Sequence, residues 1–203
     1  MIKLNNKEKI ILFACDISGT FSNTKYPENK FDKYNELGKL MKQLVDTNYS
    51  DKIIFSFLTA DDRKEFLEDY IKFFNKYVKN DNIKLGLQFF ALGELEVSSD
   101  GRFITKENYN GVYKEDKIAA YAKDLSNEYY VKDIIFADDF LNPYNIELIN
   151  HELNCNSINV YGFNPFYKDD SNSYFYSSNV NGIEGLVDCM KKYVTDKENN
   201  KQI

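Results

Sequence analysis

Short runs of apolar residues alternate along the chain with longer segments in which apolar residues recur every three or four positions. The apolar runs, which we expect to be strands, cover Ile10–Cys15, Ile53–Leu58, Leu85–Leu92, Ile134–Ala137 and Ile158–Tyr161. Continuous apolar strands that are separated by helices are typical of a parallel sheet with both faces covered. The pattern therefore predicts a three-layer, Rossmann-like α/β fold with a mostly parallel sheet.

The segments with helical spacing lie between these strands and after the last one. We expect helices over Lys33–Asp46, Asp61–Val78, Glu115–Tyr130, Pro143–Leu153 and Gly182–Val194. Each would present one apolar face to the sheet.

One segment, residues 93–111, breaks this alternation. It contains ELEVSSDGRFITKE, in which two β-prone stretches flank an SSDG turn, so it predicts a small β-hairpin insert. Because no other insert is present, we expect residues 1–194 to form one α/β domain without a full cap domain. The charged and polar residues 195–203 are expected to form a disordered tail.

Composition narrows the class of protein. The 203 residues, 43% of them hydrophobic, suffice for one well-filled core, and the net charge of -6 argues against a broad nucleic-acid or anionic-lipid surface. The first apolar run is too short for a signal sequence or a membrane span. Cys15, Cys155 and Cys189 are widely spaced without a CxxC pair, so we expect reduced packing residues. A soluble, cytoplasmic protein is the prediction.

Polar side chains stand where the expected strands end. Asp16 follows the first strand, Thr59 ends the second, and Asp138 and Asp139 follow the fourth. Lys117 lies near the start of the helix that leads into the fourth strand. Because the carboxyl ends of parallel strands line one crevice, these groups should converge there. Carboxylates suit Mg²⁺, a lysine and a hydroxyl suit phosphate oxygens, and an aspartate can attack phosphorus.

Four segments carry these residues in order: DISGT, IIFSFLTA, KEDKIAAYAKDL and IIFADDFLN. Together they resemble the four motifs of the haloacid dehalogenase-like (HAD) superfamily, whose members are mostly Mg²⁺-dependent phosphatases. The resemblance covers residues 10–142, with the fifth strand fitting behind it.

The resemblance implies roles in phosphoryl transfer for residues of the first three motifs. Asp16 would be the nucleophile, and Thr59 with the adjoining Ala60 and with Lys117 would bind the transferring phosphoryl group. Lys117 would also hold Asp16 in its ionised form.

The resemblance also implies a Mg²⁺ site. Asp16, the backbone carbonyl of Ser18 and Asp138 would bind the metal. Asp139 and Asn142 would be outer or water-mediated ligands, although Asn142 stands where the family more often has an acid.

Structural alternatives exist for the carboxylates and the hydroxyl. Asp16, followed by Ser-Gly-Thr, could open an Asx turn. Thr59 could cap the helix expected from Asp61, and Asp138 or Asp139 could cap the helix expected from Pro143.

The lysine also has alternatives. Lys117 lies in the charged stretch KEDK, which is also typical of a solvated helix face. Lys114, at the start of the same stretch, is the nearest rival for the family role.

Ser18 is the main departure from the family motif. Most of the phosphatases have an aspartate there that acts as general acid and base, a contribution of roughly 10²- to 10⁴-fold. The prediction is therefore a Mg²⁺-dependent phosphatase or phosphotransferase that acts through an aspartyl-phosphate on Asp16 and hydrolyses slowly. The alternative is a non-catalytic HAD-like binding or regulatory protein that retains the metal and phosphate site.

The small insert bears on the substrate. Without a full cap the site should be open, which suits a large phosphorylated substrate or closure by a second subunit. The loop after the first motif offers Phe21, Lys25 and Tyr26 as contacts near the mouth, unless it is a solvated loop.

Overall fold

The computed structural model describes residues 7–23, 29–59, 64–90, 95–98, 103–106, 113–154, 157–166 and 174–199. Its strands are β1 (Lys9–Asp16), β2 (Lys52–Thr59), β3 (Ile83–Leu85), β4 (Leu87–Phe90), β5 (Leu95–Ser98), β6 (Phe103–Lys106), β7 (Tyr130–Ala137), β8 (Asn159–Asn164) and β9 (Phe175–Ser177). Its helices are α1 (Phe31–Asp46), α2 (Lys64–Tyr77), α3 (Lys114–Glu128), α4 (Pro143–Leu153) and α5 (Ile183–Asn199).

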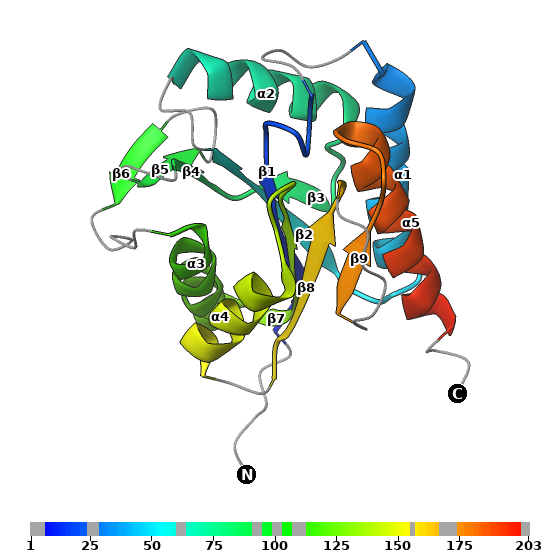
Figure 1. The fold of residues 1–203 in the computed structure, drawn as a ribbon. Coiled ribbons are helices and arrows are strands. Elements are labelled where there is room, and N and C mark those ends of the chain that lie inside the picture. The colour runs from blue at the N-terminus through cyan, green and yellow to red at the C-terminus, as the bar shows by residue number, and fades with distance from the viewer. Residues whose placement is uncertain are drawn as a thin grey trace.

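The strands form one open sheet in the order β6-β5-β4-β2-β1-β7-β8-β9, with β3 also paired to β2 (Figure 1). Strand β1 pairs in parallel with β2 and β7, and the parallel pairing continues through β8 to β9 and from β2 to β4. Among these described strands, only the β4–β5 and β5–β6 pairs are antiparallel. The predicted Rossmann-like fold class is thus confirmed.

The appended hairpin is present where the sequence predicts it. β5 and β6 pair antiparallel at the edge of the sheet, with Leu95 opposite Lys106. Two details differ from the prediction: the third apolar run divides at Gly86 into β3 and β4, and the short edge strand β9 was not expected. A side chain at Gly86 would collide with Ile54 and Tyr121, since a Cβ atom there would lie 2.5 Å from an atom of each.

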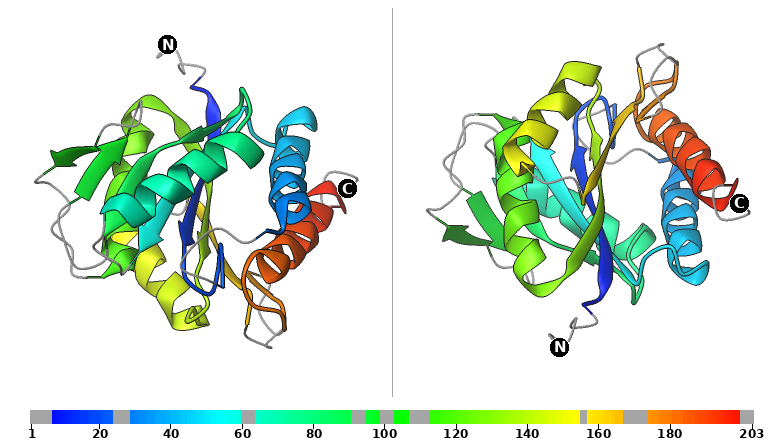
Figure 2. Two further views of the ribbon diagram at one scale, coloured as in Figure 1. Left: turned by 90° about the horizontal axis from the view of Figure 1, so that it is seen from above. Right: turned by 90° about the horizontal axis from the view of Figure 1, so that it is seen from below.

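Helices cover both faces of the sheet, which gives three layers (Figure 2). Alternate residues of β1 divide between the two faces, as the two-residue period of a strand requires. Ile11, Phe13 and Cys15 join the core that is shared with α1, α2 and α5. Ile10, Leu12 and Ala14 join the smaller core under α3 and α4.

Two of the three cysteines lie in the described part of the chain. Cys15 and Cys189 are free and buried, as predicted, and Cys155 lies outside the described residues. None of the described helices is both long enough and apolar enough to cross a membrane.

The prediction of a disordered tail from residue 195 is wrong for residues 195–199, which continue α5. Lys197 is only 8% exposed, and its Nζ donates to the hydroxyl of Tyr161 at 2.5 Å. Its ammonium also lies 3.8 Å from the centroid of that ring. This packing, which the polar sequence of the segment does not reveal, stabilises the last turns of the helix. Residues 200–203 lie outside the described residues.

A buried carboxyl group fastens four parts of the fold together. Asp133 on β7 is fully buried and accepts hydrogen bonds from the hydroxyls of Tyr49 (2.7 Å) and Tyr193 and from the amide of Asn159 (2.9 Å). These donors come from the loop before β2, from α5 and from β8. Three donors offset the cost of burying the acid.

Replacing Tyr193 with Phe removes one of these donors while it keeps the ring. We expect Tyr193→Phe to lower the free energy of unfolding by about 1–3 kcal/mol, because a buried acceptor loses a partner. Urea titration measures this, with Tyr130→Phe as the control, since Tyr130 is 47% exposed. Equal stability of the two variants would contradict a structural role for the Asp133 cluster.

Candidate active site

The register of the three central strands brings the predicted motifs to one edge of the sheet. Asp16, the last residue of β1, is the partner of Leu58, so Thr59 lies one residue beyond it on β2. Ala137 is the partner of Cys15, so Asp138 follows β7 at the level of Asp16. The carboxyl ends of β1, β2 and β7 therefore bring a hydroxyl and two acidic side chains together.

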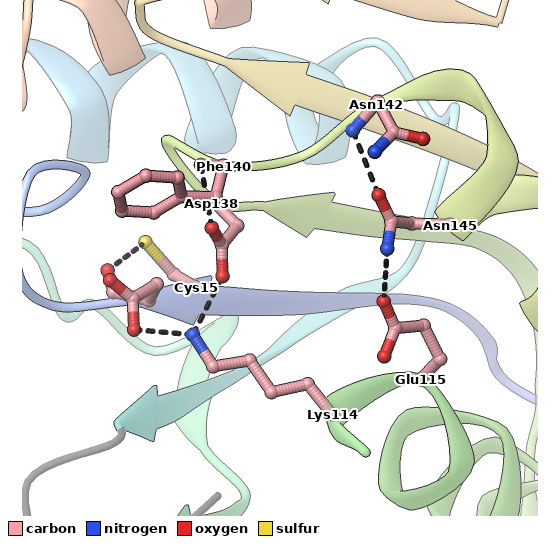
Figure 3. A network of polar contacts seen from close by, with 8 residues as sticks. Cys15, Lys114, Glu115, Asp138, Phe140, Asn142 and Asn145 are labelled. Atoms are coloured by element: carbon pink, nitrogen blue, oxygen red, sulfur yellow. Dashed lines mark hydrogen bonds and ion pairs between the residues drawn. The ribbon is translucent and has the colours of Figure 1, made fainter.

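A lysine joins the two acids (Figure 3). The Lys114 ammonium donates to Oδ1 of Asp16 at 2.7 Å and to Oδ2 of Asp138 at 2.6 Å. The side chains of Asp16, Asp138 and Lys114 are only 8%, 10% and 19% exposed. Such sheltered pairs are screened less by water and salt than surface ion pairs.

The predicted lysine, Lys117, lies one turn further along α3. Its side chain is buried, and burial lowers its pKa. The structure brings Lys114, the rival of Lys117, into contact with Asp16. The predicted helix began at Glu115, one residue too late, and so left Lys114 outside its first turn. The sequence carries no signal that separates the two lysines, because both lie at the start of the helix.

Burial and mutual repulsion shape the acidity of the site. Burial, together with the nearby Asp138 and Asp139, raises the pKa of Asp16 to about 7, although Lys114 opposes this shift. Burial alone would lower the pKa of Lys114, but the two carboxylates that it contacts outweigh this effect and raise it to about 12. Burial and Asp138 also raise the pKa of Asp139. Lys114 therefore stays charged, whereas Asp16 and Asp139 bind a proton more readily than an ordinary aspartate does.

A tight turn follows Asp16. The N–H of Phe21 donates to the carbonyl of Asp16 at 3.2 Å, and that of Ser22 to the carbonyl of Ile17 at 2.9 Å. Phe21 anchors this turn, because its ring is fully buried, 4.9 Å from that of Phe57 between centroids. The expectation that Phe21 contacts substrate at the mouth is therefore wrong. Lys25 and Tyr26 lie outside the described residues.

The turn needs glycine at position 19. Gly19 has φ of +80°, and a Cβ there would lie 2.2 Å from Oδ2 of Asp139. The first motif and the loop after β7 thus touch, with Asp139 against Gly19, the residue that follows exposed Ser18. Oδ1 of Asp139 is buried and has no hydrogen-bond partner within the described part of the chain. The side chain of Asp16 bonds to Lys114, an arrangement that an isolated Asx turn does not require.

The remaining predicted residues differ in their placement. Thr59 ends β2 and is buried, while Ala60 lies outside the described residues. Asn142 is the N-cap of α4: its Oδ1 accepts from the N–H of Tyr144 at 3.0 Å. The helix cap is therefore Asn142, and the alternative that Asp138 or Asp139 caps α4 is wrong.

Asn142 also belongs to a link between two helices. Its N–H donates to Oδ1 of Asn145 at 2.9 Å, and Nδ2 of Asn145 donates to Oε1 of Glu115 at 2.5 Å. Figure 3 shows this chain of contacts beside, and separate from, the Lys114 contacts. The link holds the start of α3, and hence Lys114, against the start of α4.

The donor set fits a divalent cation in charge and chemistry. Within the described ranges, no group of three or more His, Cys, Asp or Glu side chains is already arranged around a metal position. However, three acids, Asp16, Asp138 and Asp139, lie near the Lys114 ammonium, which bonds only to the first two. Oδ1 of Asp139 lacks a hydrogen-bond partner among the described residues. Hard oxygen atoms with excess negative charge are what Mg²⁺ prefers.

Comparison of the chain with known protein families and with curated proteins finds no match. The chemistry of this site has to be inferred from its own residues.

The raised pKa of Asp16 predicts a pH-dependent stability. Between the ordinary aspartate value of 3.8 and about 7, folded Asp16 retains a proton that the unfolded chain has lost. Its contribution to the free energy of unfolding therefore falls as pH rises through this window, by at least about 1.4 kcal/mol, the equivalent of one pKa unit. Urea titrations with a chelator should show a smaller decrease in Asp16→Asn than in wild type. Identical pH dependence in the two proteins would contradict the shift.

Proposed function

We propose that this protein is a Mg²⁺-dependent phosphatase or phosphotransferase of the HAD-like type, which acts through an aspartyl-phosphate on Asp16. One observation carries the proposal: the Lys114 ammonium joins Asp16 to Asp138 at the carboxyl edge of a parallel sheet. A buried acid, held by a cation beside a second acid, suits a nucleophile whose target is an anionic phosphoryl group.

In the first step, a carboxylate oxygen of Asp16 attacks phosphorus. The bond from phosphorus to the leaving oxygen breaks, its electron pair goes to that oxygen, and a proton comes from solvent. Lys114 keeps Asp16 oriented and, as the attack draws charge away from the carboxylate, can donate to a phosphoryl oxygen. Thr59, one residue beyond the partner of Asp16 on β2, can supply a hydroxyl donor.

In the second step, water attacks the phosphorus of the aspartyl-phosphate. The bond to Asp16 breaks, the carboxylate is restored, and inorganic phosphate leaves with the proton balance completed by solvent. In a phosphotransferase, an acceptor hydroxyl replaces the water. Exposed Ser18 offers no carboxylate to assist either proton transfer, so the second step should be slow.

Asp16, Asp138 and Asp139, with the backbone carbonyl of Ser18, are the groups that would hold Mg²⁺. When bound, the metal would offset the excess negative charge of the site and so admit an anionic substrate. Asn142 is not needed in this set, because it serves as the cap of α4.

The second candidate is a binding or regulatory protein that holds a phosphorylated ligand without turnover. The serine at position 18 favours it, because a site that only binds has no need of a general acid. Trapping with beryllium fluoride, which mimics a phosphorylated aspartate, separates the two: an enzyme should form the complex, and a pure binding protein with an unreactive Asp16 should not.

The lysine assignment gives a direct test. With Mg²⁺ and an activated aryl phosphate, Lys114→Met should lower kcat/KM by at least about 100-fold, since it removes a preorganised cation from the reacting charge. Asp16→Asn should abolish turnover. Lys123→Met is the matched control, because Lys123 lies on the same helix but is exposed. Wild-type turnover in Lys114→Met would refute the proposed role of Lys114.

Ser18→Asp should restore the missing acid and base. Because Ser18 is exposed, an added carboxylate can be accommodated, and we expect turnover of the same aryl phosphate to rise at least about tenfold. Ser18→Asn, which adds similar bulk without an ionisable group, should give no such rise. A gain in both variants, or in neither while Mg²⁺ still binds, would count against this account of the slow step.

A further inference from the structure

Large aromatic side chains are exposed around the candidate site. Phe140 is 88% exposed, Tyr113 67%, and Tyr144 and Phe166 63% each. All four belong to segments at the same edge: Tyr113 directly precedes Lys114, Phe140 follows β7, Tyr144 opens α4, and Phe166 follows β8. We call these four residues the aromatic rim. Single exposed apolar residues need no explanation, but a group at one site does.

Phe140, the most exposed member, is held in place by the site itself. Its N–H donates to Oδ1 of Asp138 at 2.8 Å, and the next residue, Leu141, is only 2% exposed. Figure 3 shows the ring beside Asp138. The backbone on both sides of Phe140 is thus fastened, and its ring projects into solvent from a fixed point next to the reacting groups.

Phe166 is tied to the same loop through Asn164, which is 1% exposed. Oδ1 of Asn164 accepts from the N–H of Phe166 at 2.8 Å, and its Nδ2 donates to the carbonyl of Leu141 at 2.6 Å. Because β7 and β8 are neighbours, this bridge fixes the backbone of the two adjacent loops that carry Phe140 and Phe166. Their exposure is built into the fold.

Exposed rings next to a phosphoryl site suit a flat ligand. Aromatic faces stack on heterocyclic bases, and each such contact adds affinity without regard to base identity. A polynucleotide is disfavoured, because the net charge of -6 and the acids of the site repel an extended polyanion. A small ester with one phosphate and one planar ring can stack on the exposed aromatic side chains and avoids the repulsion of an extended polyanion.

We propose that the aromatic rim, with Phe140 nearest the reacting groups, binds the planar ring of the substrate, so that the substrates are phosphate monoesters of the nucleoside monophosphate kind. The inference rests on the proposed function, because the phosphate of such an ester would lie at Asp16 and Lys114. The ring would add affinity that a plain sugar phosphate lacks.

Calorimetric titration in Mg²⁺ of the full chain with three probes tests the inference: adenosine monophosphate, ribose 5-phosphate and adenosine. We expect adenosine monophosphate to bind at least about tenfold tighter than ribose 5-phosphate, in line with one stacked base. Phe140→Ala should reduce this ratio to within about threefold of unity, and Phe140→Tyr, which keeps a ring, should preserve most of it. Tyr130→Ala is the control, because Tyr130 is exposed at the opposite end of β7.

The outcomes separate the two proposals. If the two phosphate esters bind equally, or if neither Phe140→Ala nor Phe166→Ala changes the ratio, the role of the rim is overturned while the phosphoryl site stands. If adenosine binds in a Phe140-dependent manner and the phosphate adds no affinity, the role of the aromatic rim is supported and the proposed phosphoryl chemistry is overturned. If none of the three probes binds, both proposals fail.

Discussion

The parallel hydrogen bonding of β1 to β2 on one side and to β7 on the other is the constraint on which the rest of the structure depends. It places the ends of three strands at one level, so that Asp16 and Asp138 come close enough for a single ammonium, that of Lys114, to bind both. Two acids buried this near each other would repel strongly without that cation. The backbone pairing thus brings two acids close together, and Lys114 at the start of α3 compensates their repulsion.

Lys114 compensates only part of the negative charge at this edge of the sheet. One ammonium faces three acids, and burial, together with the neighbouring acids, raises the pKa values of Asp16 and Asp139. Gly19 allows the first motif to approach the loop after β7 so closely that any side chain there would strike Asp139. The proposed activity uses both features: the excess negative charge would hold a metal ion, and the sheltered Asp16 would be the nucleophile.

The Asp133 cluster and the candidate site lie at different levels of the same strand, β7. Near the start of β7, Asp133 is surrounded by Tyr49, Tyr193 and Asn159, which close the fold around it. Beyond the end of β7, Oδ1 of Asp139 has no hydrogen-bond partner among the described residues, and Phe140 projects into solvent. The first arrangement favours one packed state, whereas the second leaves groups ready to contact a ligand.

Local patterns were enough to predict the layered fold, the hairpin and the approach of Asp16, Thr59 and Asp138, because strand ends follow from hydrophobic runs and parallel strands align those ends. They could not choose between Lys114 and Lys117, since both fit a helix start and only the docking of α3 against α4 sets which ammonium reaches Asp16. Nor could they reveal the buried end of α5 or the buried ring of Phe21. Those depend on contacts between segments far apart in the chain, with Lys197 against Tyr161 and Phe21 against Phe57, and such contacts exist only once the sheet has formed.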